Sequence, residues 1–90
     1  MSIKVHIHNA YKRYTDGNQI VECEGKNVGE CLRDLIKRYP LIRDQIFDKG
    51  GKLKNTIEIF INNASAYPDE LNRRVKDGDD IFITLLLAGG

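Results

Sequence analysis

The sequence is poor in cysteine, carries little net charge and has no long hydrophobic run. Its two cysteines, Cys23 and Cys31, do not form a Cys-x-x-Cys pair, and no paired histidines complete a zinc-binding pattern, so we expect reduced thiols and no metal site. A formal net charge of +1 without a block of basic residues argues against a nucleic-acid partner. No apolar run approaches the roughly 18 residues of a membrane span, and the first residues lack a signal-peptide core. We therefore expect no membrane association and a cytoplasmic location.

The length of the chain predicts one domain. A chain of 90 residues has room for a single hydrophobic core, which excludes a second domain. Its 41% hydrophobic and 30% charged residues are typical of a globular protein and not of a disordered or disulfide-rich one. We expect this domain to cover residues 1–85 and to be followed by a flexible, reactive tail over residues 86–90.

The first part of the chain predicts an antiparallel hairpin. Residues 3–8 alternate strictly between apolar and polar side chains, which indicates a half-buried strand. Residues 16–18 have the composition of a turn. Residues 19–24 then form the second strand, with Val21 and Cys23 facing the core.

The middle of the chain predicts the main helix. Asn27 followed by Glu30 resembles a capping box, and apolar residues recur at helical spacing as far as Tyr39. Pro40 ends this helix. Residues 41–47 have spaced apolar side chains but form only a short segment, so we expect a helical turn that closes one edge of the core.

The second half of the chain predicts two more long strands. Residues 57–61 alternate again, and residues 80–85 form a closing strand after the turn at residues 76–79. Residues 64–75 have weak periodicity, which favours a loop with a short edge strand.

The order of these elements predicts an α+β fold, in which a mixed sheet of four to five strands wraps over one main helix. A doubly wound sheet is excluded because only one helix is long enough to cover a sheet. The first and last strands are expected to pair in parallel at the centre, since the helical segment between them is long enough for a crossover.

The last residues of the sequence, Ala88-Gly89-Gly90, indicate a chemical role for the end of the chain. Glycine loses the most conformational freedom when it is ordered, so this ending is useful mainly if it must enter a narrow site. A terminal carboxyl has a pKa near ~3.5, and its carbonyl carbon resists nucleophiles until it is activated, for example as an acyl-adenylate. We therefore expect Gly90 to react, while residues 86–90, at most about 17 Å long, thread the active site of a partner.

Taken together, these features resemble the ubiquitin-like β-grasp sulfur carriers, the group that contains the small subunit of molybdopterin synthase and the thiamine-pathway sulfur carrier. The resemblance covers most of the chain. It rests on the opening hairpin, the capped helix ending in Tyr39-Pro40, the strand at residues 57–62 followed by Asn63, the turn Lys76-Asp77-Gly78-Asp79-Asp80, and the final Ala88-Gly89-Gly90.

This resemblance implies that the chain is a protein-borne sulfur donor and not an enzyme. An E1-like adenylyltransferase would use ATP and magnesium to adenylylate Gly90, and a sulfur donor would then leave a thiocarboxylate there. The thiocarboxylate would deliver sulfur to an acceptor synthase. The large subunit of molybdopterin synthase is the first choice, and the cysteine, methionine and thiamine pathways are the others. ATP and magnesium would bind the activating partner, so no cofactor is expected on this chain.

Residues close to the terminus are the first candidates for partner binding. Leu85, Leu86 and Leu87 are three apolar residues at the exit of the closing strand, and alternation buries only some of them. They either form a docking surface or cover the open end of the core. Ala88 and Gly89 would occupy the channel of the partner beside Gly90.

Two further groups of candidates lie earlier in the chain. Phe60 and Phe82 fall on the outer face of the predicted sheet, where they either form a patch for a partner or lie under a loop. Arg73 and Arg74, with Lys76, either steer an acidic partner toward the tail or are ordinary solvated charges.

Two other functions remain open at this point. In the first, the chain is a ubiquitin-like modifier whose Gly90 forms isopeptide bonds with lysines of target proteins. In the second, it is a β-grasp binding module with an incidental Gly-Gly, and deletion of those glycines would leave its function intact. His6 and His8 share one face of a predicted strand, but no third ligand is evident nearby, so they are interpreted as solvated side chains.

Overall fold

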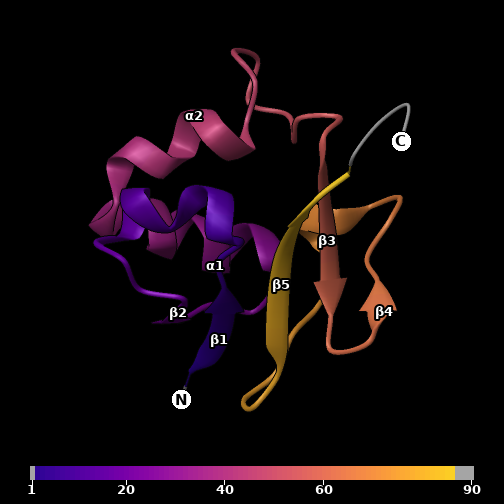
Figure 1. Cartoon of the computed structure of the whole chain (residues 1–90). Helices are drawn as coiled ribbons and strands as arrows, with labels where there is room; N and C mark the ends of the chain where they lie inside the picture. The colour runs from indigo at the N-terminus through magenta and orange to yellow at the C-terminus, as the bar shows by residue number, and fades with distance from the viewer. Residues whose placement is uncertain (1, 87–90) are drawn as a thin grey trace.

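Five strands form one mixed sheet in the order β2-β1-β5-β3-β4, as Figure 1 shows. The computed structural model describes residues 2–86. β1 is antiparallel to β2 and parallel to β5, and β5 is antiparallel to β3. The predicted α+β fold, with the first and last strands parallel at the centre, is confirmed. The strands are β1 (Ile3–His6), β2 (Ile20–Cys23), β3 (Ile57–Ile61), β4 (Ala64–Ser65) and β5 (Asp80–Leu85).

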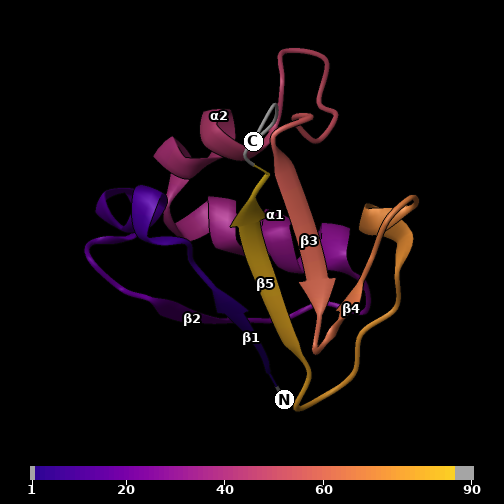
Figure 2. The ribbon, with the colours of Figure 1, turned by 45° about the vertical axis from the view of Figure 1, so that its right-hand side comes forward.

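The main helix, α1 (Val28–Arg38), packs across one face of this sheet, as the two ribbon views show (Figures 1 and 2). The predicted N-cap is present, because Asn27 Oδ1 accepts a hydrogen bond from Glu30 N at 2.8 Å. The reciprocal bond differs from a capping box by one residue: Glu30 Oε1 accepts from Lys26 N, before the cap, at 2.8 Å. The helix ends before Pro40. A short 3-10 helix, η2 (Pro40–Ile42), and the single turn α2 (Arg43–Ile46) follow it.

The core lies between α1 and the inner face of the sheet. Alternation along the strands buries Val5, Ile59 and Ile81, while the apolar stripe of α1 buries Leu32 and Leu35. Burying a side chain of this size contributes about 2 kcal/mol relative to exposure. β5 lies at the centre of the sheet between β1 and β3, and its buried residues Ile81 and Ile83 belong to this core.

The structure differs from the sequence prediction in three places. β1 ends at His6 instead of residue 8, because His8 begins a 3-10 helix, η1 (Asn9–Thr15), that was not predicted. Residues 70–72 form another unpredicted 3-10 helix, η3 (Glu70–Asn72). Leu41 was expected to help close the core, but 76% of it is exposed, and its neighbours Ile42 and Ile46 are buried instead.

The turn before β5 is held by one buried carboxylate. Gly78 has a φ of +88°, which suits glycine, and Asp79 Oδ2 accepts a hydrogen bond from Lys76 N at 2.9 Å. This backbone bond holds the pKa of Asp79 below its ordinary value of 3.8, Asn62 and the Lys76 ammonium act in the same direction, and burial opposes them. Because the pKa is lower in the folded state, ionised Asp79 stabilises the fold above about pH 4.

Replacing Asp79 with asparagine is expected to lower the free energy of unfolding at pH 7 by about 1–2 kcal/mol, because the turn loses a charged acceptor. In the wild type, this contribution disappears as the pH falls from about 4 through the lowered folded-state pKa. Urea unfolding at pH 7 and near pH 3 should therefore show a smaller difference between the two proteins at the lower pH. Asp77→Asn, in the same turn but exposed, is the control. An equal difference at both values would contradict this role of the charge.

Candidate functional site: the end of β5 and the outer face of the sheet

The described chain ends at a fixed point beside β3. Leu85 pairs with Ile57, and the N–H of Leu86 donates to the carbonyl oxygen of Thr56 at 2.7 Å. Leu85 is partly buried against the core, whereas 47% of Leu86 is exposed. Leu85 therefore covers the open end of the core, and Leu86 is exposed at the surface, where it can take part in docking. Leu87, Ala88, Gly89 and Gly90 lie outside the described residues.

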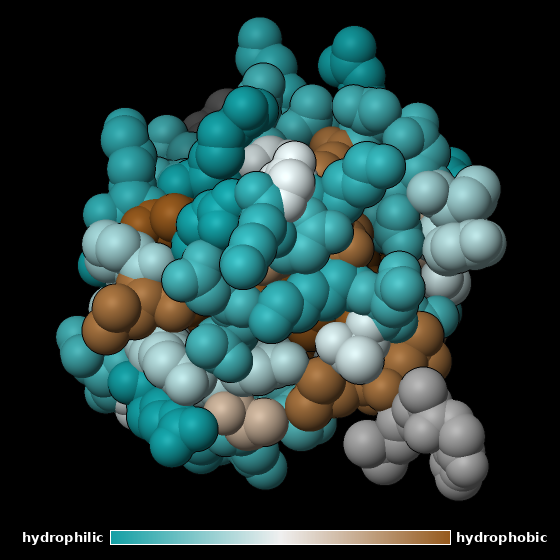
Figure 3. Space-filling model, turned by 90° about the horizontal axis from the view of Figure 1, so that it is seen from above, coloured by the Kyte–Doolittle hydropathy of each residue, from teal (hydrophilic) through white to brown (hydrophobic). Residues whose placement is uncertain are grey.

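A groove of about 670 Å³ runs beside Leu86. No pattern in the sequence predicts it. One wall is the segment 51–55, and the other is the segment 67–72, where 71% of Tyr67 is exposed. Figure 3 looks onto this end of the molecule and shows separate hydrophobic areas among mostly hydrophilic side chains. We call the groove between residues 51–55 and 67–72 the tail groove.

The outer face of the sheet carries a row of apolar and aromatic side chains. Phe60 and Phe82 are direct cross-strand neighbours, so the predicted pair lies side by side. His6 lies opposite Phe82 on the other side, with the two rings stacked at a centroid distance of 4.1 Å. Ile20, which is 49% exposed, lies opposite His6. We call Ile20, His6, Phe82 and Phe60 the sheet row.

Charged side chains flank the sheet row. Along one side, Lys4 pairs in register with Glu22 and with Asp80, whose Oδ1 lies 2.8 Å from His6 Nε2. Along the other side, Glu58 pairs with Thr84. Three carboxylates and one ammonium group therefore border the row, which suits a partner with an apolar ridge and basic side chains around it.

The two predicted arginines occupy different environments. Arg73 is tied to its own loop, because its guanidinium donates to the carbonyl oxygens of Ala66 at 3.1 Å and Tyr67 at 3.4 Å. Arg74 is exposed and forms a β-bridge with Asn27. Lys76 precedes β5, so the six residues of that strand, about 20 Å, separate it from the tail.

The two histidines and the two cysteines contribute to the structure of the domain. The interpretation of both histidines as solvated is wrong for His6, which is partly buried and stacks on Phe82. His8 is exposed, and its Nδ1 accepts a hydrogen bond from Ala10 N at 3.0 Å and so caps η1. Cys23 and Cys31 are fully buried, and burial raises the pKa of the first thiol to about 12 and of the second to about 11. At neutral pH both are protonated, which confirms the expectation of core thiols.

Two features are absent from residues 2–86. This part of the chain contains no group of three or more His, Cys, Asp or Glu side chains that could hold a metal ion. It also contains no helix that is both long enough and apolar enough to cross a membrane.

A mixed five-stranded sheet wrapped over one helix, with a parallel pair at its centre, defines a ubiquitin-like β-grasp protein. The chain matches the ThiS family over residues 5–90, and it belongs to that family. It is therefore a ubiquitin-like sulfur carrier or modifier. No curated protein matches the chain.

Solved structures agree with this assignment. CysO from Mycobacterium tuberculosis is 25% identical with a TM-score of 0.87, over 94% of this chain and 99% of that one. A chain of the BexX/CysO complex from Amycolatopsis orientalis is 29% identical with a TM-score of 0.87, over 98% and 99%. The small archaeal modifier protein 1 (SAMP1) from Methanosarcina acetivorans is 27% identical with a TM-score of 0.86, over 99% and 96%.

Proposed function

We propose that this chain is a sulfur carrier whose Gly90 carboxylate is adenylylated by an E1-like enzyme and converted to a thiocarboxylate. The observation that carries the proposal is the match to the ThiS family, because it runs through Gly90. The geometry supports it. β5 lies between β1 and β3, so the residues after Leu86 start from a strand that is held on both sides.

The proposed chemistry uses the carboxylate as a substrate. One of its oxygens attacks the α-phosphate of ATP on the activating enzyme, and pyrophosphate leaves. Hydrosulfide, as the sulfur donor, then adds at the carbonyl carbon, AMP departs with that oxygen and its bonding electron pair, and the new carbon–sulfur bond leaves a thiocarboxylate on Gly90. ATP and magnesium bind the activating enzyme in this scheme. The chain contributes a docking surface and a reactive group.

We assign docking of the activating enzyme to the sheet row. An aromatic pair on an open sheet face offers the flat apolar area that protein interfaces bury at their centre. The BexX/CysO complex shows that a protein similar to this chain binds another protein. Leu86 extends the contact toward the reacting residue, and the arginines at positions 73 and 74 remain predicted steering charges.

Replacing Phe82 with alanine should weaken docking by about 2 kcal/mol, or about 30-fold, because Phe82 lies between His6 and Phe60 at the centre of the row. The measurement is the rate of adenylylation by the activating enzyme as a function of carrier concentration. The higher concentration needed for half-maximal rate reports docking. Leu41→Ala is the control, since it removes an exposed leucine that does not belong to the sheet. Identical behaviour of both variants would place the docking surface elsewhere.

The first test of the function is the mass of the C-terminal fragment of the protein purified from its own cell. The resolution must separate exchange of oxygen for sulfur from addition of oxygen, which share a nominal mass. Exchange at Gly90 is the expected result. An unmodified carboxylate, in cells that contain the activating enzyme, would contradict the proposal.

A second candidate function is protein modification through Gly90. The observation that favours it is the likeness to SAMP1, whose name identifies it as a small modifier protein. The same adenylate serves both functions. Conjugates of higher mass that contain Gly90 linked to lysines would support the modifier, and a free thiocarboxylate without conjugates would support the carrier.

The acceptor of the sulfur is a separate proposal. Molybdopterin synthesis remains the first choice, followed by cysteine, methionine and thiamine synthesis. Incubating the thiocarboxylate form with the large subunit of molybdopterin synthase and its substrate, and measuring loss of sulfur from Gly90, tests that choice.

A further inference from the structure

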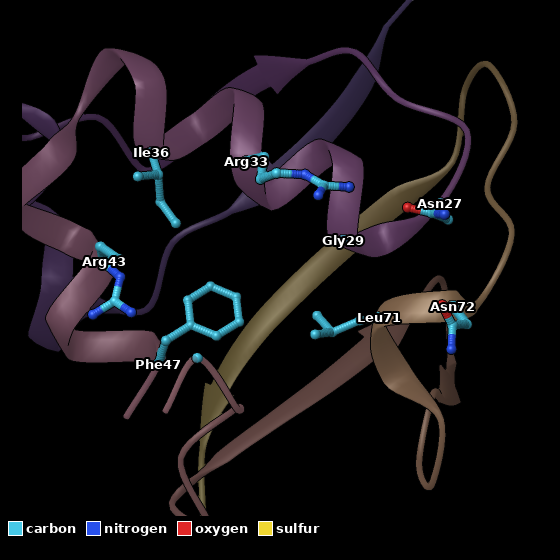
Figure 4. Close-up of a pocket in the computed structure, with 9 residues that line it drawn as sticks. Asn27, Gly29, Arg33, Ile36, Arg43, Phe47, Leu71 and Asn72 are labelled. Carbon is cyan, nitrogen blue, oxygen red and sulfur yellow. The ribbon is translucent and has the colours of Figure 1, made fainter. Parts of the chain in front are cut away.

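A second groove, of about 470 Å³, lies on the helical side of the molecule. Figure 4 shows it between α1, the segment after α2 and η3. We call it the helix groove. Its lining residues come from all three regions: Asn27, Gly29, Arg33, Ile36, Arg43, Phe47, Gly51, Leu71 and Asn72.

The floor of the helix groove is apolar. Phe47 and Leu71 face each other across it in Figure 4, and Ile36 lines it from α1. Gly29 allows η3 to approach the helix, since a Cβ there would lie only 3.1 Å from the carbonyl oxygen of Leu71. This close approach brings the start of α1 and η3 together where both line the groove.

Among residues 2–86, the charged side chains that line the helix groove are those of Arg33 and Arg43. Arg43 Nη1 lies 2.9 Å from Asp44 Oδ1, but the Asp44 side chain is 81% exposed, so this surface ion pair is weak. Within residues 2–86, Arg33 forms no ion pair closer than 4 Å. An extended ligand with an apolar side chain and an anionic end complements this lining.

The helix groove adjoins the tail groove. Gly51, Leu71 and Asn72 line both of them, and Leu86 lines the tail groove. The sequence after Leu86 is Leu87-Ala88-Gly89-Gly90, which is one apolar residue, three small residues and a carboxylate. Four extended residues reach at most about 13 Å.

We propose that residues 87–90 dock back onto their own domain, through the tail groove into the helix groove, with the Gly90 carboxylate attracted by the positive charges of Arg33 and Arg43, which line the helix groove from separate positions. This proposal rests on the proposed function only in taking Gly90 as the anionic end. A thiocarboxylate is also an anion, so the same arginines hold the loaded form. A docked end is shielded from water and from adventitious nucleophiles until a partner draws it out, and the activating enzyme must compete with the groove for Gly90.

The test is carried out on the full-length chain labelled with ¹⁵N. In the wild type, the amide signals of Gly89 and Gly90 should differ from those of an unstructured peptide of the same sequence. In Arg33→Gln/Arg43→Gln they should move to the peptide positions. Arg13→Gln/Lys26→Gln removes two exposed charges outside both grooves and should leave the signals in place. A chain with a Gly90 carboxamide, and about 1 M salt, at which the Debye length falls to about 3 Å, should each release the end as well.

Signals that are identical in the wild type and in the Arg33/Arg43 double variant would overturn the proposal. Signals that change with protein concentration would also overturn it, because they would show the end of one chain bound to another. The mass measurement on Gly90 is independent of this experiment. A wild type that carries sulfur but has peptide-like glycine signals would retain the proposed function and exclude the docked end.

Discussion

Replacing Gly90 with valine is expected to reduce formation of the acyl-adenylate by at least about 100-fold, because a displaced reacting atom loses the alignment that the active site provides. The Cβ and methyl groups of valine fill the space in which a partner must align the carboxylate with ATP. The free energy of unfolding should not change, since residue 90 comes five positions after Leu85, the last residue of β5. The measurement is ATP-dependent formation of the adenylate by the activating enzyme, followed by mass spectrometry of the carrier.

Gly50→Val is the matched control for this experiment. It makes the same substitution on an exposed turn, where the nearest atom to a new Cβ is Asp48 Oδ1 at 3.4 Å. Adenylylation of this variant should equal that of the wild type. If Gly90→Val were adenylylated at the wild-type rate, the argument that the end of the chain threads a narrow site would fail.

The sequence predicts the sheet well because local signals agree with the tertiary fold there. Turn residues bound the alternating segments that become β3 and β5, so the ends of both strands were predicted to the residue. η1 was missed because a 3-10 helix has no amphipathic stripe to detect. It depends on a cap from His8 and on Thr15 Oγ1, which donates to the carbonyl oxygen of Asn18 at 2.8 Å.

The sequence predicts the candidate site only where the site depends on the alternation of apolar and polar side chains along a strand. Phe60 and Phe82 were placed on the outer face because their neighbours face the core. Their direct pairing, and the addition of His6 and Ile20 to the row, depend on strand register, which alternation does not determine. The two grooves depend on contacts between segments far apart in the sequence, as between Gly29 and Leu71.

Replacing Leu32 with alanine is expected to lower the free energy of unfolding by about 2–5 kcal/mol, because it leaves a cavity at a fully buried position. This is a large part of the roughly 5–13 kcal/mol available to a domain of this size. Alanine is the best helix former, so the loss reports packing of α1 on the sheet and not the stability of the helix itself. Urea unfolding followed by circular dichroism measures it, with Lys37→Ala on the exposed side of α1 as the control.

Leu32→Ala and Gly90→Val should separate the two parts of the molecule. The core variant should be adenylylated at the wild-type rate at a temperature where it is folded, since its docking face and its end are intact. The tail variant should be fully stable and inactive. A Leu32→Ala protein that is folded but not adenylylated would show that adenylylation of Gly90 depends on the packing of α1. The hypothesis that the core determines only stability and the end of the chain only reactivity would then be wrong. A loss of stability below about 1 kcal/mol would contradict a tightly packed contact between α1 and the sheet.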